Sequence, residues 1–148
     1  MKETGVYLAS VYDGEIQTVE FQDPWGTVCL YLMPFLKPAT VRWALEEEDI
    51  STYEEAVAAA IRRLTPDPSK RNVLVSHQFV AGAARCDSEE IFVGGLDQVS
   101  ADLFAAFDYV ALGHLHSPQR VERETVRYCG SPLKYSFSEA SQDRKSVV

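Results

Sequence analysis

The stretch Tyr109–His116, which reads YVALGHLH, places a short apolar run directly before two histidines. An apolar run of this length with polar flanks is typical of a strand buried in a parallel sheet. Gly113 permits a sharp exit from the strand and a close approach of the backbone to a bound ion. The stretch therefore predicts a β-strand whose carboxyl end delivers His114 and His116 to the edge of a sheet.

A second stretch, Val73–Gln78 (VLVSHQ), repeats this pattern with His77 after its apolar run. The chain has three histidines, and all of them lie in these two stretches. The segment between them has room for one loop, one helix and a neighbouring strand, and the carboxyl ends of such strands meet at one sheet edge. Imidazole is the commonest protein metal ligand. We therefore predict that His77, His114 and His116 form a metal site, with three unrelated surface or core histidines as the alternative.

Strand patterns and helix patterns alternate around these stretches, which predicts an α/β fold. The first third of the chain reads as an antiparallel hairpin or meander, with a turn at Asp23–Gly26 in which Trp25 packs against the fold. Proline in the first turn favours a helix from Pro38, and Ser51 or Thr52 can cap the next helix. We expect strands over residues 5–10, 16–21, 27–33, 73–75 and 109–112, within 121–129 and from 145, and helices over 38–45, 51–64 and 100–107.

The composition is that of an ordinary globular protein. A length of 148 residues suits one domain that buries a core without disulfides. The three cysteines form no Cys-x-x-Cys pair, and Cys29 reads as a small buried thiol. The sequence has no membrane-spanning apolar run and no signal-peptide pattern, which favours a cytoplasmic protein. The formal net charge of −8 argues against tight DNA binding by this chain alone.

The two histidine motifs together resemble the last two motifs of calcineurin-like metallophosphoesterases. The resemblance is strongest to one branch, the nuclease subunit of the SbcCD complex, and extends from about Gly5 to the last residue. The matching segments are Ser76–Ala83 (SHQFVAGA), Val93–Val99 (VGGLDQV), Phe107–Gln119 (FDYVALGHLHSPQ), Tyr128–Glu139 (YCGSPLKYSFSE) and the shorter Leu32–Phe35 (LMPF).

This resemblance implies a partial metallophosphoesterase β-sandwich flanked by helices, with residues 1–148 as a single domain. In that family a pair of metal ions, usually manganese, lies between two halves of an α/β sandwich. Carried over by motif, His77 and His114 would bind one ion and His116 would bind the other. Two such cations activate a hydroxide for attack on a phosphodiester, which in this branch is the backbone of DNA.

The family's other ligands come from three earlier motifs, Asp-x-His, Gly-Asp-x-x-Asp and Gly-Asn-His-Asp or its Glu variant, which this sequence lacks. Asn72 is the only asparagine, and we expect it to precede the strand. Without a bridging carboxylate, three imidazoles would hold metal weakly. We therefore expect a C-terminal portion of a nuclease domain that lacks the N-terminal βαβ portion and the capping domain. We assign no catalytic residue and predict that the chain is inactive alone.

For the full-length protein, the resemblance implies an SbcC-type ATPase partner and action on double-stranded DNA ends or hairpins in DNA repair and recombination. It allows a homodimer and implies no membrane partner. Two alternatives stay open. One is a fragment of another calcineurin-like phosphoesterase that acts on nucleotides or phosphoproteins, and the other is a non-catalytic assembly module that retains the histidines.

Other polar residues in the matching segments have two interpretations. Asp97, Gln98, Ser131 and Ser136 can line a DNA path or serve structural turns. The segment Ser136–Glu139 (SFSE) has the spacing of a helix capping box, which explains its glutamate without a role in catalysis.

Overall fold

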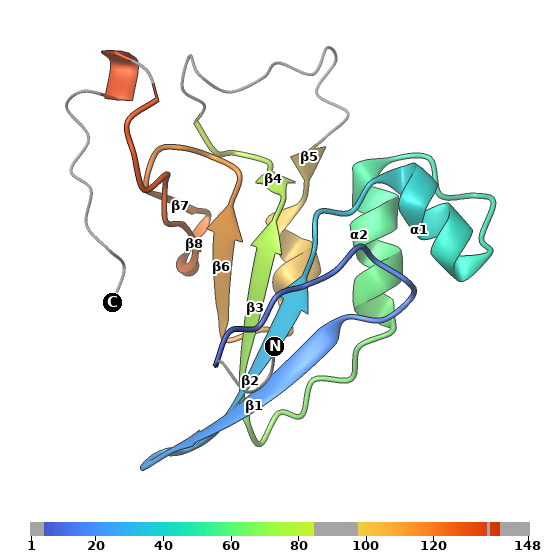
Figure 1. Cartoon of the computed structure of the whole chain (residues 1–148), viewed down its shortest axis with the longest axis horizontal. Helices are drawn as coiled ribbons and strands as arrows, with labels where there is room; N and C mark the ends of the chain where they lie inside the picture. Colours follow the sequence, from blue (N-terminus) through green and yellow to red (C-terminus); the bar gives the residue numbers. More distant parts are fainter. Residues whose placement is uncertain (1–4, 85–97, 136, 140–148) are drawn as a thin grey trace.

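The computed structural model describes residues 5–84, 98–135 and 137–139 (Figure 1). A mixed six-stranded sheet forms its centre, in the order β1 (Gln17–Asp23), β2 (Gly26–Met33), β3 (Arg71–His77), β6 (Tyr109–Gly113), β8 (Arg123–Tyr128) and β7 (Gln119–Val121). The four central strands run parallel, whereas β1 and β7 pair antiparallel at the two edges. The predicted α/β class is confirmed, and the two apolar runs that precede the histidines are adjacent central strands.

Helices connect these strands. The α-helices α1 (Pro38–Leu45) and α2 (Tyr53–Arg62) lie between β2 and β3, and 3-10 turns form η2 (Ala101–Phe104) and η3 (Phe137–Glu139). A small second sheet pairs β4 (Phe79–Val80) with β5 (Gln98–Val99). The helix α2 packs against α1, β5 and η2. Among the described residues, no helix has the length and apolar character needed to cross a membrane.

Thr52 caps α2, which is one of the two caps that the sequence allows, and with Glu55 it forms a capping box. The Thr52 hydroxyl accepts a hydrogen bond from the Glu55 amide at 3.1 Å, and the Glu55 carboxylate accepts one from the Thr52 amide at 2.9 Å. The first bond satisfies an amide that the helix would otherwise leave unpaired, and the second fixes the entry of the chain. One side of the helix, which carries small side chains, is buried. The helix ends at Arg62 rather than at the expected Leu64.

The core lies on the sheet face that the helices cover. Alternate residues of a strand point to opposite faces. On the central strands one alternating set is buried throughout, namely Cys29, Tyr31, Met33, Asn72, Leu74, Ser76, Val110, Leu112, Val126 and Tyr128. The predicted burial of the Cys29 thiol is confirmed, and Phe107 packs edge to face on Tyr31 with ring centroids 5.4 Å apart.

The opposite face of the sheet is only partly covered. Leu32, Val75 and Ala111 lie side by side in register on this face, and Val75 keeps 38% of its surface exposed. The segment Tyr7–Ala9 crosses in front of β2 and β3 and with the strands bounds a groove of about 440 Å³ (Figure 1). An apolar run such as residues 73–75 is typical of a strand covered on both faces, but the helices in the described part of the chain cover one face alone.

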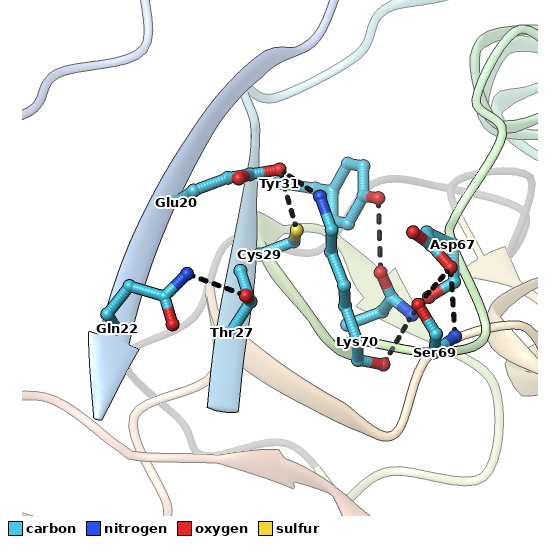
Figure 2. Close-up of polar contacts among 9 residues, drawn as sticks. Glu20, Gln22, Thr27, Cys29, Tyr31, Asp67, Ser69 and Lys70 are labelled. Carbon is cyan, nitrogen blue, oxygen red and sulfur yellow. Dashed lines mark hydrogen bonds and ion pairs between the residues drawn. The ribbon is translucent and has the colours of Figure 1, made fainter. Parts of the chain in front are cut away.

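Polar contacts join the start of β3 to the β1–β2 hairpin (Figure 2). Lys70 forms an ion pair with Glu20 at 2.6 Å. The Asn72 amide group accepts from the Tyr31 hydroxyl at 3.1 Å and donates to the Asp67 carbonyl at 2.8 Å. Contrary to prediction, Asn72 lies inside β3 rather than before it, and its buried side chain supports the fold.

Three other local predictions are wrong. Residues 6–10 form no strand, because they lie over the sheet face instead of pairing with an edge. Trp25 is 83% exposed and does not pack, because the tight turn carries it beyond β1 and β2. The helix expected over 100–107 is a single 3-10 turn, because Asp108 already hydrogen-bonds to β3. The strand expected from residue 145 lies outside the described residues.

Candidate functional site

Two of the histidines gather where neighbouring parallel strands end. His77 is the last residue of β3, and its register partner Gly113 is the last residue of β6. His114 follows directly, so both rings lie at the carboxyl edge of the sheet. In open α/β sheets, loops at this edge build ligand sites.

The imidazole rings of His77 and His114 meet edge to face, with centroids 5.3 Å apart and ring planes at 88°. Phe35, just after β2, lies 6.2 Å from His77 and 6.3 Å from His114 between ring centroids. The ring of Phe79 lies 6.1 Å from His114. Aromatic contacts at these distances favour particular ring orientations. The structure thus brings His77 and His114 together, with Phe35 beside both rings and Phe79 beside that of His114.

Gly113 makes this approach feasible by its lack of a side chain. A Cβ atom at this position would lie 2.9 Å from Nδ1 of His77, which is closer than real Cβ contacts. The strained turn falls on His114 instead, whose φ is 98°. Such a conformation costs a residue with a side chain about 1–3 kcal/mol and clusters at functional sites. The predicted role of Gly113 is therefore corrected: it leaves space for the His77 ring, and His114 makes the sharp exit.

Desolvation shifts the pKa of the His77 ring. Neighbouring atoms partly shield the His77 imidazole, and this desolvation lowers the pKa of His77 below its ordinary value of 6.5. The neutral ring is the form that can donate a lone pair to a metal. His77 therefore keeps its metal-binding form at neutral pH.

The third histidine is held by a different set of contacts. Nδ1 of His116 lies 3.1 Å from Oε1 of Glu139, and its ring centroid lies 5.3 Å from that of Tyr135. The His116 side chain is 25% exposed, whereas the Glu139 side chain has no exposed surface. The sequence prediction missed Glu139, because its SFSE context accounts for it as a helix cap.

The turn after β8 anchors the backbone of His116. The Ser131 amide donates to the His116 carbonyl at 3.2 Å. Gly130 has a φ of 78°, and a Cβ atom there would lie 2.9 Å from the same carbonyl oxygen. The Ser131 hydroxyl donates to the Leu133 carbonyl at 2.7 Å, which favours its structural interpretation. Of the other polar candidates, Gln98 is an exposed residue of β5, and Asp97 and Ser136 lie outside the described residues.

The spacing of the His77 and His114 rings is compatible with part of a metal site. Two imidazoles that share one ion, each with a nitrogen about 2.1 Å from it, have ring centres about 5 Å apart. The separation of His77 and His114 matches this value. Within the described residues there is no group of three or more His, Cys, Asp or Glu side chains placed to hold a metal ion. Among the described residues, the imidazoles are therefore candidate nitrogen ligands, and a buried carboxylate lies behind that of His116.

A scan of the chain against models of known protein families finds no match.

Proposed function

We propose that this chain is the C-terminal portion of a metal-dependent DNA nuclease domain of the SbcD type. The observation that carries the proposal is the meeting of His77 and His114 at the carboxyl ends of adjacent parallel strands. In this proposal the two rings bind one divalent ion and His116 binds a second. The ions are manganese by the family resemblance, and they supply Lewis-acid chemistry for phosphodiester hydrolysis when bound.

In that scheme the residues of this chain bind the metal ions and orient the ligand side chains. His77 and His114 offer neutral nitrogens from two different strands, so their spacing is set by the sheet. The Phe35 ring lies beside both imidazoles, and the Phe79 ring lies beside that of His114. The chain supplies ligands but no group that we assign to proton transfer.

The half-covered sheet face supports the view that a second layer completes the site. Parallel strands are normally covered on both faces. Here Leu32, Val75 and Ala111 form an apolar row on the face away from the helices, and His77 lies on the same side of β3 as Val75. A layer on this face would lie next to the histidines. We propose that it carries the Asp-x-His, Gly-Asp-x-x-Asp and Gly-Asn-His-Asp motifs.

The net charge of this chain affects how the full-length protein would bind DNA. The formal charge of −8 repels a phosphate backbone, and acidic side chains outnumber basic ones by 22 to 14. We propose that contacts to double-stranded DNA ends or hairpins lie on other parts of the full-length protein, on a homodimer, or on an SbcC-type ATPase partner. Cytoplasmic DNA repair is the setting in this proposal.

The test assays a full-length protein that contains both this chain and a segment with the three missing motifs. We expect Mn²⁺-dependent cleavage of a DNA hairpin, which His77→Ala, His114→Ala and His116→Ala each abolish. Glu124→Gln is the matched control, because this exposed residue pairs with Arg120 and Arg127 away from the histidines.

Other outcomes of this test separate the alternatives. Cleavage of small phosphate esters without cleavage of DNA would indicate another calcineurin-like phosphoesterase. A parent reading frame without the three motifs would favour a non-catalytic module. Mn²⁺-dependent hydrolysis of bis-p-nitrophenyl phosphate by this chain alone, lost in His116→Ala, would refute the claim that it is inactive by itself.

A further inference from the structure

The carboxyl group of Glu139 is buried between two hydrogen-bond donors. Its Oε1 lies 3.1 Å from Nδ1 of His116, and its Oε2 accepts from the Tyr135 amide at 3.0 Å. The side chain has no exposed surface. Burial of a carboxylate costs free energy unless its oxygens are paired. Both contacts therefore help to offset the cost of burying this carboxylate.

A helix cap alone does not account for this arrangement. A capping glutamate needs one oxygen on a backbone amide at an exposed helix start, and Glu55 shows this form at the start of α2. Glu139 shares the backbone contact but also reaches a side chain 23 positions earlier in the chain. The second contact joins η3 to the loop after β6.

We propose that Glu139 is a positioning residue that holds His116 as its Nδ1–H tautomer, so that Nε2 keeps its lone pair for a metal ion. The inference rests on the proposed function in that it takes His116 to be a metal ligand. The oxygen of an ionised carboxylate only accepts, so with Glu139 ionised Nδ1 carries the proton in this contact. Carboxylates behind ligand histidines fix both the tautomer and the orientation of the ring in metal sites.

Two further contacts make the ring orientation specific. The Tyr135 ring packs against the His116 ring at 5.3 Å, and Glu139 holds the backbone of the same tyrosine. The His116 carbonyl is fixed by the Ser131 amide at 3.2 Å. The backbone, one ring nitrogen and one ring face of His116 are thus all held, while a quarter of the side chain stays exposed.

The first test needs no substitution. Nitrogen NMR of the metal-free chain at about pH 8, where free imidazole is neutral, distinguishes the two tautomers of each histidine. We expect His116 as the Nδ1–H form, although imidazole in water favours the Nε2–H form. A predominant Nε2–H form at His116, or rapid averaging of the two, would overturn the inference.

The second test replaces the glutamate. Glu139→Met removes both acceptors and keeps the length of the side chain in an enclosed site, so we expect His116 to change to the Nε2–H form. Glu124→Met is the matched control, since Glu124 is 66% exposed and pairs with two arginines. If Glu139→Met folds and leaves the His116 tautomer unchanged, Glu139 is structural only and the proposal is wrong.

A metal probe separates this inference from the proposed function. With Zn²⁺ as the probe and NMR of the histidines as the readout, Glu139→Met should weaken the response of His116 by about tenfold to a hundredfold and spare that of His77. An equal response of His116 in the parent chain and the variant would overturn the positioning role. If no histidine of the unsubstituted chain responds to Zn²⁺, the proposed function is contradicted. The tautomer of His116 is measured without metal, so that result still tests the positioning role separately.

Discussion

The rings of His77 and His114 lie edge to face with centroids 5.3 Å apart, although the residues are separated by a crossover in the chain. The parallel register of β3 and β6 pairs His77 with Gly113 and so places the next residue, His114, beside it. The contact is therefore a product of the sheet. Changes that alter this register or the space around His77 should alter both rings together.

The Gly113→Ala variant tests the space beside His77. The new Cβ atom would lie 2.9 Å from Nδ1 of His77, so we expect the ring to move and the free energy of unfolding to fall by about 1 kcal/mol. Denaturant unfolding measures the loss, and proton NMR of His77 measures the displacement.

The control for that change is a double-mutant cycle. In a His77→Ala background the contact is gone, and Gly113→Ala should then be neutral or stabilise by about 0.4–1 kcal/mol through the unfolded chain. Equal losses in both backgrounds would show that the His77 ring does not explain the glycine.

The backbone strain at His114 predicts an unusual order of stability. Because φ is 98° at this position, glycine should be tolerated better than alanine. We expect His114→Gly to be the more stable variant, with a free energy of unfolding about 1 kcal/mol higher than that of His114→Ala. Thermal and denaturant unfolding of the two variants give this difference directly, and a more stable alanine variant would argue against a strained turn.

The buried hydroxyl of Tyr128 ties β4 to the main sheet. It donates to the Gln78 carbonyl at 2.7 Å and accepts from the Val80 amide at 2.8 Å. Tyr128→Phe leaves these buried groups without the hydroxyl, so we expect a loss of about 1–3 kcal/mol in unfolding free energy. Tyr109→Phe is the matched control on β6, because no hydrogen bond of its hydroxyl is found among the described residues, and it should change stability much less.

The capping box of α2 predicts a specific response to acid. Hydrogen bonds from the Ser51 and Thr52 amides lower the pKa of Glu55 from its ordinary value of 4.5 to about 2. Since the folded-state pKa is the lower one, this contribution to stability is present above pH 4.5 and is lost as the pH falls towards 2. Glu55→Gln should therefore flatten the acid limb of the stability profile.

The neighbouring Glu54→Gln variant controls for the change of charge. Glu54 lies in the same first turn but makes no capping contact, so its removal should leave the acid limb as in the parent chain. Identical profiles for both variants would assign the effect to net charge instead of to the capping box.

The sequence predicts those parts of the fold that depend on local chemistry. The bounds of α1, the cap of α2 and the strands β3 and β6 follow from proline, threonine and short apolar runs. The functions of Gly113 and Glu139 depend on residues that are distant in the chain, His77 and His116. No local pattern contains these contacts, so they become visible only once the sheet and its loops are assembled.

A Zn²⁺ titration followed by NMR of both imidazoles tests most directly whether His77 and His114 act together as ligands of one divalent ion. We expect the two rings to respond at the same metal concentration, and weakly, because the described residues form no group of three or more metal-binding side chains. His77→Ala should weaken the response of His114 by about tenfold or more, equivalent to about 1.4 kcal/mol. Unrelated midpoints for the two rings, or an unchanged His114 response in His77→Ala, would contradict the account.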